Sequence, residues 1–427
     1  MSDVEAELVV ERMSELGAGV AAWEGRTVFI DRTAPGDRVR ARVFREGKVW
    51  RGELLELVSP SSDRQQAPCA LNDRCGGCDW MHLRPEAQLR AKEEIVLSAL
   101  EHLGGIPRGT FALKPISGGA PEGTRRRAVL HFSRQQLVFF APKSHKPVPV
   151  ERCIALSPPL VDLPGRLSPL LAPISRDVDE VHLLAEGLET AFALVLKDSV
   201  RERHLKAAHR AIEALGFRGA VLTPPQGRET VVAKPTLRAR CGAGAPRYLR
   251  PDAFSQAHAE LNEAVVTSGV DGLAVSPGSR VLELFSGNGN FTFAIAAAGA
   301  AEVIAVESTR VSLELARQSA RAADVTNARF VLGDAETVAR GLVGERARFD
   351  RLLLDPPRAG FPSCGELARA LGVERVVYVS CNPSSLARDA AGLVSAGYTP
   401  ESVQPFDLFP QTHHMETVMA FSRERDR

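Results

Sequence analysis

The first 58 residues alternate apolar and polar positions in short runs, which is the pattern of half-buried β-strands. Glycines at positions 17, 19, 25, 36 and 47 separate the runs and favour tight turns between them. Several short strands at such spacing predict a small OB-like β-barrel over residues 1–58. The runs that carry this pattern lie at residues 7–10, 27–30, 39–43 and 52–55.

A different pattern begins at Pro277, where short β-branched runs alternate with helical segments. This alternation is typical of an α/β domain built on a parallel sheet. The expected strands of this α/β region are residues 280–284, 302–306, 329–332, 350–354, 375–379, 401–406 and 417–421.

The stretch between these two regions is less regular. Residues 85–103 repeat with a helical period, whereas residues 114–250 are mixed in pattern and rich in proline and glycine. At 427 residues the chain exceeds what one hydrophobic core organises, so two or three domains are expected. The apolar positions of the predicted helix are Leu89, Ile95, Val96, Leu100 and Leu103.

The composition is that of an ordinary globular protein, with 44% hydrophobic and 25% charged residues and a formal net charge of +1. The longest apolar stretch, residues 291–301, is too short to span a membrane. The acidic N-terminus has no apolar core of the kind found in signal peptides. We therefore expect a cytoplasmic protein with no membrane partner.

Positive charge is concentrated in two patches. Seven basic residues fall within residues 32–51, and six within residues 121–146, including the run of three arginines at 125–127. Arg38, Arg40 and Arg42 alternate along one predicted strand and therefore share a face that can meet a phosphate backbone. A solvated arginine-rich face on a purely structural barrel explains the same pattern, so charge alone leaves nucleic-acid binding open.

The seven cysteines are unevenly placed, since Cys69, Cys75 and Cys78 lie within ten residues and Cys153 stands far downstream. In a cytoplasmic chain such cysteines argue against a disulfide framework. Four thiolates suit either a zinc ion or a 4Fe–4S cluster, and geometry alone does not choose between them. Structural zinc ribbons usually carry two Cys-x-x-Cys pairs, whereas this group has one. The remaining cysteines are Cys241, Cys364 and Cys381.

A glycine-containing loop, Phe-Ser-Gly-Asn-Gly-Asn at residues 285–290, follows the first strand of the α/β region. Glycines let the backbone turn sharply and approach a ligand at the carboxyl edge of a parallel sheet. Glu307 closes the second strand, where a carboxylate can accept both ribose hydroxyls, and Asp334 ends the third, placed for an adenine amine. This arrangement looks like the S-adenosylmethionine pocket of a class I methyltransferase. No lysine follows the glycines, which disfavours a phosphate-binding P-loop.

The fourth and fifth strands end in residues suited to covalent chemistry. Asp355 precedes two prolines that fix an irregular loop, and its carboxylate can hydrogen-bond the edge of a base. Cys381 stands at the tip of the fifth strand, where a thiolate is a strong nucleophile. A thiolate that adds to C6 of uracil places negative charge on C5, which then accepts a methyl group. A base must remove the C5 proton; Glu416 is the candidate, with His413 and His414 as alternatives.

Three motifs together resemble the RNA (uracil-5)-methyltransferase family, specifically its iron–sulfur branch acting on ribosomal RNA. They are Asp-Pro-Pro-Arg-Ala-Gly at 355–360, Ser-Cys-Asn-Pro at 380–383 and His-Met-Glu-Thr at 414–417. The resemblance implies that Cys381 is the nucleophile and Glu416 the base. A Phe-x-Gln element at 254–256 implies that Gln256 contacts cofactor or substrate. The family's cofactor positions correspond to Phe285, Asn290, Glu307, Asp334 and Asp355.

The resemblance also implies a 4Fe–4S cluster beside S-adenosylmethionine, with ligands at Cys69, Cys75, Cys78 and Cys153. The target uridine, in ribosomal RNA by preference, must be unpaired or flipped out to reach the cysteine, and both basic patches are expected to contact RNA. We expect a monomer. The implied domains are a TRAM RNA-binding barrel at 1–58, a central α+β iron–sulfur domain at 59–81 and 113–250, and a Rossmann-like methyltransferase domain with a seven-stranded sheet at 82–112 and 251–427.

Other functions remain open from the sequence. A cytosine C5 methyltransferase uses the same thiolate logic, but the fourth strand lacks the second cysteine of that family. A non-catalytic RNA-binding or ribosome-assembly factor usually loses at least one of Cys381, Glu416 and Asp355, and all three are present. Methylation of uridine 54 in transfer RNA differs only in its substrate. An amino-group methyltransferase is disfavoured because Arg358 stands where an aromatic residue stacks on the base.

Overall fold

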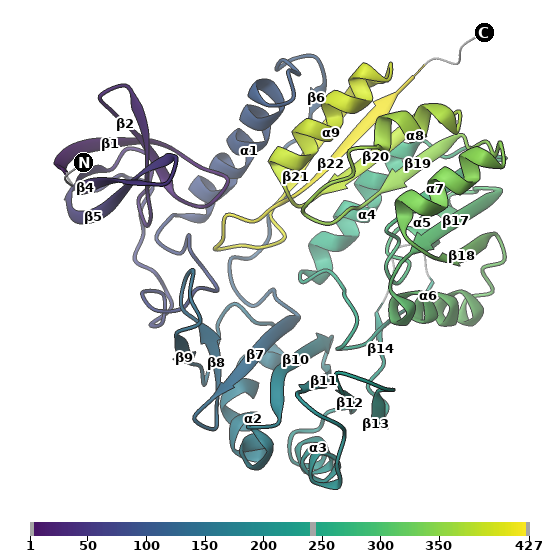
Figure 1. Cartoon of the computed structure of the whole chain (residues 1–427), viewed down its shortest axis with the longest axis horizontal. Helices are drawn as coiled ribbons and strands as arrows, with labels where there is room; N and C mark the ends of the chain where they lie inside the picture. Colours follow the sequence, from purple (N-terminus) through teal and green to yellow (C-terminus); the bar gives the residue numbers. More distant parts are fainter. Residues whose placement is uncertain (1–3, 240–244, 424–427) are drawn as a thin grey trace.

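The computed structural model describes residues 4–239 and 245–423, so Cys241 lies outside the described residues. An N-terminal barrel, a central sheet and a larger sheet covered by helices lie side by side (Figure 1). Within the described part of the chain, no helix combines the length and apolar character that crossing a bilayer requires.

The N-terminal region is a closed five-stranded barrel in the order β1-β2-β3-β5-β4, which confirms the predicted barrel. Its strands alternate buried and exposed positions, so that Leu8, Val28, Ile30 and Val39 fill the interior. The sequence pattern missed one of the five strands, β2, because all five of its residues are apolar or glycine and show no alternation. The strands are β1 Val4–Met13, β2 Gly19–Trp23, β3 Arg26–Ile30, β4 Arg38–Glu46 and β5 Val49–Ser59.

The three arginines of β4 share one face, as the alternation predicts, but that face is charge-balanced. Each guanidinium pairs with a glutamate of a neighbouring strand, at N–O distances of 2.7 to 3.4 Å. Exposed ion pairs of this kind are weak, so a phosphate can displace a carboxylate from its arginine. The three carboxylates nevertheless reduce the attraction between this face and a phosphate. The pairs are Arg38–Glu7, Arg40–Glu56 and Arg42–Glu53.

The central region is a seven-stranded sheet in the order β13-β12-β11-β10-β7-β8-β9. Helices α2 and α3 pack on one face, where Leu167 and Ala208 meet Phe192 and Leu194 of the sheet. A short hairpin, β14-β15, leads on toward the last region. The elements are β7 Arg127–Ser133, β8 Gln136–Phe140, β9 Pro147–Pro149, η1 Pro158–Leu160, α2 Leu163–Leu171, η2 Ala172–Ile174, β10 Val178–Glu186, β11 Glu189–Leu196, α3 Glu202–Leu215, β12 Gly219–Thr223, β13 Thr230–Ala233, β14 Leu237–Ala239 and β15 Arg247–Leu249.

The C-terminal region contains all seven expected strands, with ends that agree to within two residues. They form one sheet in the order β18-β17-β16-β19-β20-β22-β21-β6, parallel from β18 to β20. The expected count of seven strands is therefore wrong by one. The eighth strand, β6 (Ala112–Leu113), comes from before the central sheet and pairs with the edge strand β21. The others are β16 Arg280–Leu284, β17 Glu302–Glu307, β18 Ala328–Leu332, β19 Arg351–Leu354, β20 Arg375–Ser380, β21 Thr399–Phe406 and β22 Glu416–Ser422.

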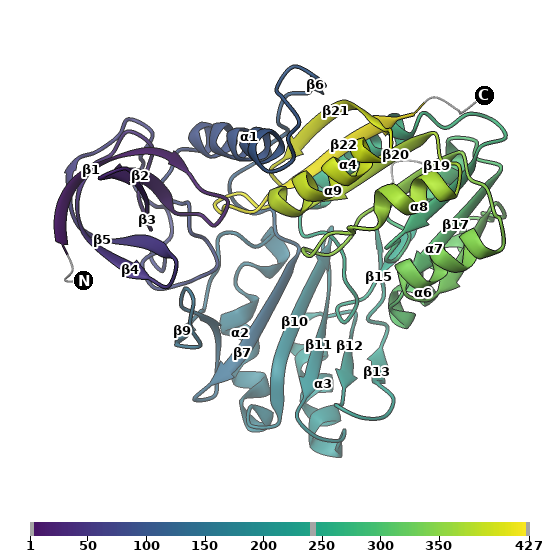
Figure 2. The same ribbon diagram turned by 45° about the horizontal axis from the view of Figure 1, so that its top comes forward.

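Helices cover both faces of this sheet (Figure 2). On one face, α4 and α5 bury residues such as Val265 and Ile295 against the strands, and α6 lies beside β18. On the other, α1, α7, α8 and α9 form the largest core, where Leu100 of α1 lies in the same cluster as Leu386 of α9. The helices are α1 Pro85–His102, α4 Ala259–Leu273, α5 Thr292–Ala297, α6 Arg310–Ala322, α7 Ala335–Gly344, α8 Cys364–Ala370 and α9 Pro383–Ser395.

The predicted helix therefore forms as α1, with one correction at its end. Leu103 caps the helix and is 61% exposed, whereas Val96 and Leu100 are fully buried. The last apolar position belongs to the turn that follows, because the buried stripe of the helix has already ended.

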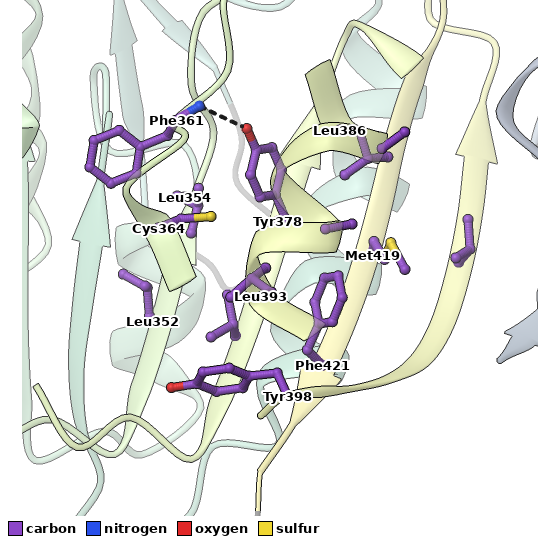
Figure 3. Close-up of a cluster of buried hydrophobic side chains, with 14 of the residues drawn as sticks. Leu352, Leu354, Phe361, Cys364, Tyr378, Leu386, Leu393, Tyr398, Met419 and Phe421 are labelled. Atoms are coloured by element: carbon purple, nitrogen blue, oxygen red, sulfur yellow. Dashed lines mark hydrogen bonds between the residues drawn. The ribbon is translucent and has the colours of Figure 1, made fainter. Parts of the chain in front are cut away.

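The largest core also fixes the loop that follows β19 (Figure 3). Tyr378 of β20 accepts a hydrogen bond from the backbone N–H of Phe361 at 3.2 Å and donates one to Asp389 at 2.6 Å. Asp389 also accepts the N–H of Phe361 at 2.5 Å. A buried aspartate on α9 thus holds the end of the loop that begins at Asp355.

Candidate active site

The candidate cofactor loop leaves the carboxyl end of β16 through a strained turn. Phe285 has a φ of +62°, a conformation that a bulky side chain rarely adopts and that is typical of functional sites. At Gly289 (φ +86°) a Cβ atom would lie 2.5 Å from the Phe293 ring, so glycine is required there. Glu307 at the end of β17 accepts the N–H of Gly287 at 2.9 Å through Oε2. Its carboxylate therefore lies directly against the loop.

Two further predicted cofactor residues are linked to this loop through α4. Asn290 is buried, and its amide exchanges two hydrogen bonds with that of Asn262 on α4, at 2.9 and 3.0 Å. Gln256 is also buried just before α4, and its carbonyl accepts a hydrogen bond from Arg126 at 2.8 Å. The Asn290 amide thus has a structural task in tying the loop to the helix.

Asp334, the third predicted acid, is exposed and caps α7. Its Oδ1 accepts hydrogen bonds from the backbone N–H and the hydroxyl of Thr337, both at 2.8 Å. These bonds hold the pKa of Asp334 below its usual value, so the group is a carboxylate. Asp334 stands beyond β18, Glu307 ends β17 and the glycine loop follows β16, so these groups succeed one another at neighbouring strand ends.

The candidate nucleophile lies in a turn that its own neighbours fix. Cys381 follows β20 and is half-buried. The Ser380 hydroxyl donates to the Asn382 carbonyl at 3.0 Å and accepts the Asn382 N–H at 3.1 Å. Asn382 then caps α9 by accepting the Ser385 N–H at 3.1 Å, and Pro383 occupies the first helical position. Every residue of the Ser-Cys-Asn-Pro motif except the cysteine is thus committed to the turn.

Cys381, Asp355 and Glu416 form a group that we call the acid–thiol cluster. Burial, followed by the charges of Glu416 and Asp355, raises the pKa of the Cys381 thiol to about 11, and Arg358 opposes this rise. Burial also raises the pKa of Asp355 to about 7. Glu416 is 2% exposed, and burial followed by the Asp355 charge raises its pKa well above the usual value. The three groups therefore influence one another, and the pKa of each lies above its ordinary value.

A buried carboxyl that was not singled out from the sequence lies behind this cluster. Glu283 of β16 is fully buried, and its Oε2 lies 2.5 Å from the hydroxyl of Thr292. Burial raises its pKa to about 8, and the Asp355 charge contributes. Glu283 thus lies between the start of α5, through Thr292, and the charge of Asp355 in the acid–thiol cluster.

The alternative bases are less suited to the task. His413 Nδ1 is held by Asp79 at 2.6 Å, so that nitrogen is occupied. Burial, helped by His413 and Arg358, lowers the pKa of His414 to about 3, so its ring is neutral at physiological pH. A cavity of about 80 Å³ is lined by Glu15, Leu16, Arg358, Cys381, Asn382, Pro383, His413, His414 and Met415.

The loop that carries Glu416 is fixed by a buried network that the sequence analysis missed. We call this group the loop anchor: Lys92, Asp407, Gln88, Gln411 and Trp80. Lys92 is fully buried and donates to Asp407 at 2.5 Å and to a carbonyl of the loop at 3.2 Å. Gln88 donates to the Gln411 side chain at 3.0 Å and accepts its backbone N–H at 2.9 Å. The signal was present, because Lys92 stands four residues from Gln88 and from Val96 on the buried stripe of α1.

The four cysteines predicted to bind a metal line one cavity of about 190 Å³. Burial raises the pKa of the Cys75, Cys78 and Cys153 thiols; neighbouring cysteines add to this rise and Arg125 opposes it. The six cysteines in the described part of the chain are all free of disulfides. Among the described residues, no group of three or more His, Cys, Asp or Glu side chains converges closely enough to hold a single metal ion.

The arginine run at 125–127 has structural partners. Arg126 is 4% exposed and pairs with Glu186 at 2.6 Å, so the expectation that it contacts RNA is wrong. Arg127 donates to the Ala253 carbonyl. Arg125 donates to the Gly77 carbonyl at 2.9 Å, and its Nη2 lies 3.5 Å from the Cys78 sulfur. Sequence could not separate the buried Arg126 and its two half-buried neighbours from a surface patch, because the run shows charge but not burial.

The fold and the strand-end groups define a class of protein. A structure of the Pyrococcus abyssi tRNA (uracil-54, C5)-methyltransferase in complex with S-adenosyl-L-homocysteine matches with a TM-score of 0.73 and 21% identity. The match covers 97% of this chain and 100% of that chain. The protein therefore has the fold of the S-adenosylmethionine-dependent methyltransferases, with a barrel at its N-terminus.

Sequence comparison gives the family. Residues 247–424 match the family described as tRNA (Uracil-5-)-methyltransferase. A 23S rRNA (uracil(1939)-C(5))-methyltransferase RlmD from Alkalilimnicola ehrlichii is 37% identical over 98% of this chain and 96% of its own length. The 23S rRNA (uracil(1939)-C(5))-methyltransferase RlmD from Pseudomonas putida is 35% identical over 97% of this chain and 93% of its own length. The chain belongs to the RNA uracil-C5 methyltransferase family.

Proposed function

We propose that the protein transfers a methyl group from S-adenosylmethionine to C5 of a uridine in RNA. The observation that carries this proposal is the acid–thiol cluster, in which one cysteine and two carboxyls influence one another at the strand ends of a methyltransferase fold. Membership of the RNA uracil-C5 methyltransferase family supports the same reaction.

In the proposed reaction the Cys381 sulfur adds to C6 of the uracil as a thiolate. This addition places the negative charge on C5, which attacks the methyl group; the bond between that methyl and the sulfonium sulfur breaks, and S-adenosylhomocysteine leaves. Glu416 then takes the C5 proton, and the C6–S bond breaks to restore the ring and the thiolate. Arg358 is the cation that favours the thiolate. Asp355, with a pKa of about 7, holds the edge of the uracil by a hydrogen bond.

S-adenosylmethionine supplies an electrophilic methyl group on its sulfonium. The residues that would hold it are Glu307 for the ribose hydroxyls and Asp334 for the adenine amine, with Gln256, Phe285, Asn290 and Asp355 around them. The fit is supported by the strained backbone at Phe285 and by the glycine at 289, where the chain has no room for a side chain. The neutral Glu283 carboxyl behind the loop adds no charge that would compete with this arrangement.

We further propose that the four cysteines hold a 4Fe–4S cluster. A zinc ion needs all its sulfurs within about 2.3 Å, whereas these thiols surround a cavity of about 190 Å³ without converging on one point. Anaerobic purification followed by iron and acid-labile sulfide analysis, with Cys78→Ser as the control, tests this assignment.

The proposed substrate is ribosomal RNA, because the related bacterial proteins are named for 23S rRNA, with transfer RNA as the alternative. We propose that the protein acts in the cytoplasm as a monomer, with the TRAM barrel at 1–58, the iron–sulfur domain at 59–81 and 113–250, and the methyltransferase domain at 82–112 and 251–427.

Nucleoside mass spectrometry of separated ribosomal and transfer RNA, from cells with and without the protein, tests the proposed function. We expect 5-methyluridine to disappear from the ribosomal fraction. Its loss from transfer RNA alone would change the substrate. A fall in 5-methylcytidine alone would overturn the uracil assignment, and no change in either would favour a non-catalytic RNA-binding protein.

A further inference from the structure

The turn between β1 and β2 of the barrel reaches the catalytic cavity. Glu15 and Leu16 of this turn line the same cavity as Cys381 and Arg358. The Leu16 side chain is also 70% exposed, so it is accessible to a partner from outside. An apolar side chain therefore projects at the mouth of the cavity where the uracil would enter.

This turn is rigid. The Ser14 N–H donates to the Ala18 carbonyl at 2.8 Å, and the Ala18 N–H donates back to the Ser14 hydroxyl at 3.1 Å. The Gly17 carbonyl accepts a hydrogen bond from the buried Trp80 indole at 2.9 Å. A fixed backbone carries Leu16, so little conformational entropy is lost when its side chain meets a partner.

The turn is also bound to the catalytic region itself. Glu15 accepts a hydrogen bond from the Ser384 hydroxyl at 2.6 Å, and Ser384 lies three residues after Cys381 in the first turn of α9. At Gly17 (φ +88°) a Cβ would lie 2.3 Å from Asp79, which holds His413. The position of Leu16 is thus set relative to the nucleophile and not only relative to the barrel.

We propose that Leu16 enters the base stack of the RNA beside the target uridine and fills the space that the uridine leaves when it flips out. Apolar side chains are used in this way because a flipped base leaves an unfilled gap, whose neighbours would otherwise lose their stacking. Arg358, exposed on the same cavity, supplies a guanidinium for the backbone phosphate next to that gap. Leu16 is in this sense a positioning residue, and its role rests on the proposed function.

Leu188 provides a matched control. It is 93% exposed, in the turn between β10 and β11 of the central sheet, and it is not among the residues that line the catalytic cavity. Leu16→Ala and Leu188→Ala remove the same atoms from exposed turns, so neither is expected to change the thermal midpoint appreciably. Leu16→Met restores an apolar side chain of similar volume.

The first test measures kcat/KM for methylation of a folded ribosomal RNA fragment and of a short single-stranded RNA with the same target sequence. For Leu16→Ala we expect a drop of about tenfold on the folded fragment and less than about twofold on the single strand, where no base need be unstacked. Leu16→Met is expected to recover most of the loss, and Leu188→Ala to match the wild type on both. Equal losses on the two substrates, or no loss on either, would overturn the inference.

The second test does not require methyl transfer. A 2-aminopurine placed beside the target uridine becomes brighter when the base stack opens, and we expect this rise with Cys381→Ala but not with Leu16→Ala/Cys381→Ala. A wild type that methylates RNA while both variants give the same fluorescence would overturn the role of Leu16 alone. A wild type that methylates no uridine would overturn the proposed function, while a fluorescence rise that still depends on Leu16 would leave base-stack entry supported.

Discussion

The loop anchor and the acid–thiol cluster are two groups of largely buried polar residues near either end of residues 407–416, and they differ in how fully their members are paired. In the loop anchor, Lys92 meets Asp407 at 2.5 Å, and both polar ends of the Gln88 amide are bonded. In the acid–thiol cluster two carboxyls and a thiol share one region, and Arg358 is the cation that offsets them.

This difference distinguishes the loop anchor, which stabilises the fold, from the acid–thiol cluster, which is suited to chemistry. Paired charges lower the energy of one arrangement and hold the loop, whereas crowded acids raise one another's pKa toward the range useful for proton transfer. The loop anchor holds the segment that leads to Glu416. It therefore keeps Glu416 beside the other two members of the cluster, although their crowding is unfavourable. Four substitutions, ordered from the largest expected effect to the smallest, test this contrast.

Cys381→Ala is expected to abolish methylation, because no other group in the cluster can form the C6 bond. Transfer of labelled methyl groups to RNA measures the loss, and RNA binding should remain. Cys364→Ala is the matched control, since that thiol is fully buried in the core, where burial raises its pKa to about 12. Methylation that survives in Cys381→Ala would refute the proposed nucleophile.

Glu416→Gln is expected to lower turnover by about 10²–10⁴-fold, the usual contribution of a general base. Because the C5 proton then stays in place, the C6–S bond cannot break, and a covalent RNA–protein species should accumulate. Denaturing electrophoresis with labelled RNA detects it. The double variant with Cys381→Ala should show no such species; if it does, the adduct is not formed through Cys381.

Lys92→Met is expected to lower the free energy of unfolding by about 3–5 kcal/mol, because Asp407 is left charged and buried without its partner. Urea unfolding measures this change. Lys206→Met removes an exposed pair with Glu202 and should cost less than about 0.5 kcal/mol. If both substitutions lowered the free energy of unfolding equally, the buried Lys92–Asp407 pair would be no more stabilising than the surface Lys206–Glu202 pair.

Arg358→Gln is expected to slow alkylation of Cys381 at pH 8 by a few-fold. Only the thiolate reacts, so the rate rises with pH toward the thiol pKa of about 11, and losing the cation moves that pKa upward. Iodoacetamide labelling followed by peptide mass spectrometry measures the rate against pH. Arg210→Gln on α3 is the control; a rate for Arg358→Gln that equals it would show that Arg358 does not act on the thiol.

The strands of the catalytic sheet were predictable because their runs are apolar and regularly spaced, and the strand ends then located the candidate residues. The extra strand β6 was not, since two residues carry no pattern and their pairing with Ser402 and Val403 is set by tertiary contacts. Strand β2 was missed for a related reason, because its residues do not alternate between apolar and polar types.

The motifs indicated the residues of the acid–thiol cluster, but not the neighbours that hold them. Lys92 and Asp407 are 315 residues apart, and no local pattern joins them. The same is true of Glu15 and Ser384, which place the barrel turn at the active site. For the arginine run the sequence predicted a functional contact where the structure has a structural one. The reason is that sequence shows the charge of Arg126 but not its burial against Glu186.

The position of β22 has a consequence for the order of events during synthesis. The last strand of the chain does not join the sheet at an edge but lies between β20 and β21. A chain emerging from its N-terminus can close the barrel early, since all five strands lie within the first 59 residues. The sheet is complete only after β22, which begins at Glu416, has been synthesised and has paired with β20 and β21. The nascent chain can therefore hold a folded barrel long before β22 supplies Glu416, the proposed base, and completes the sheet.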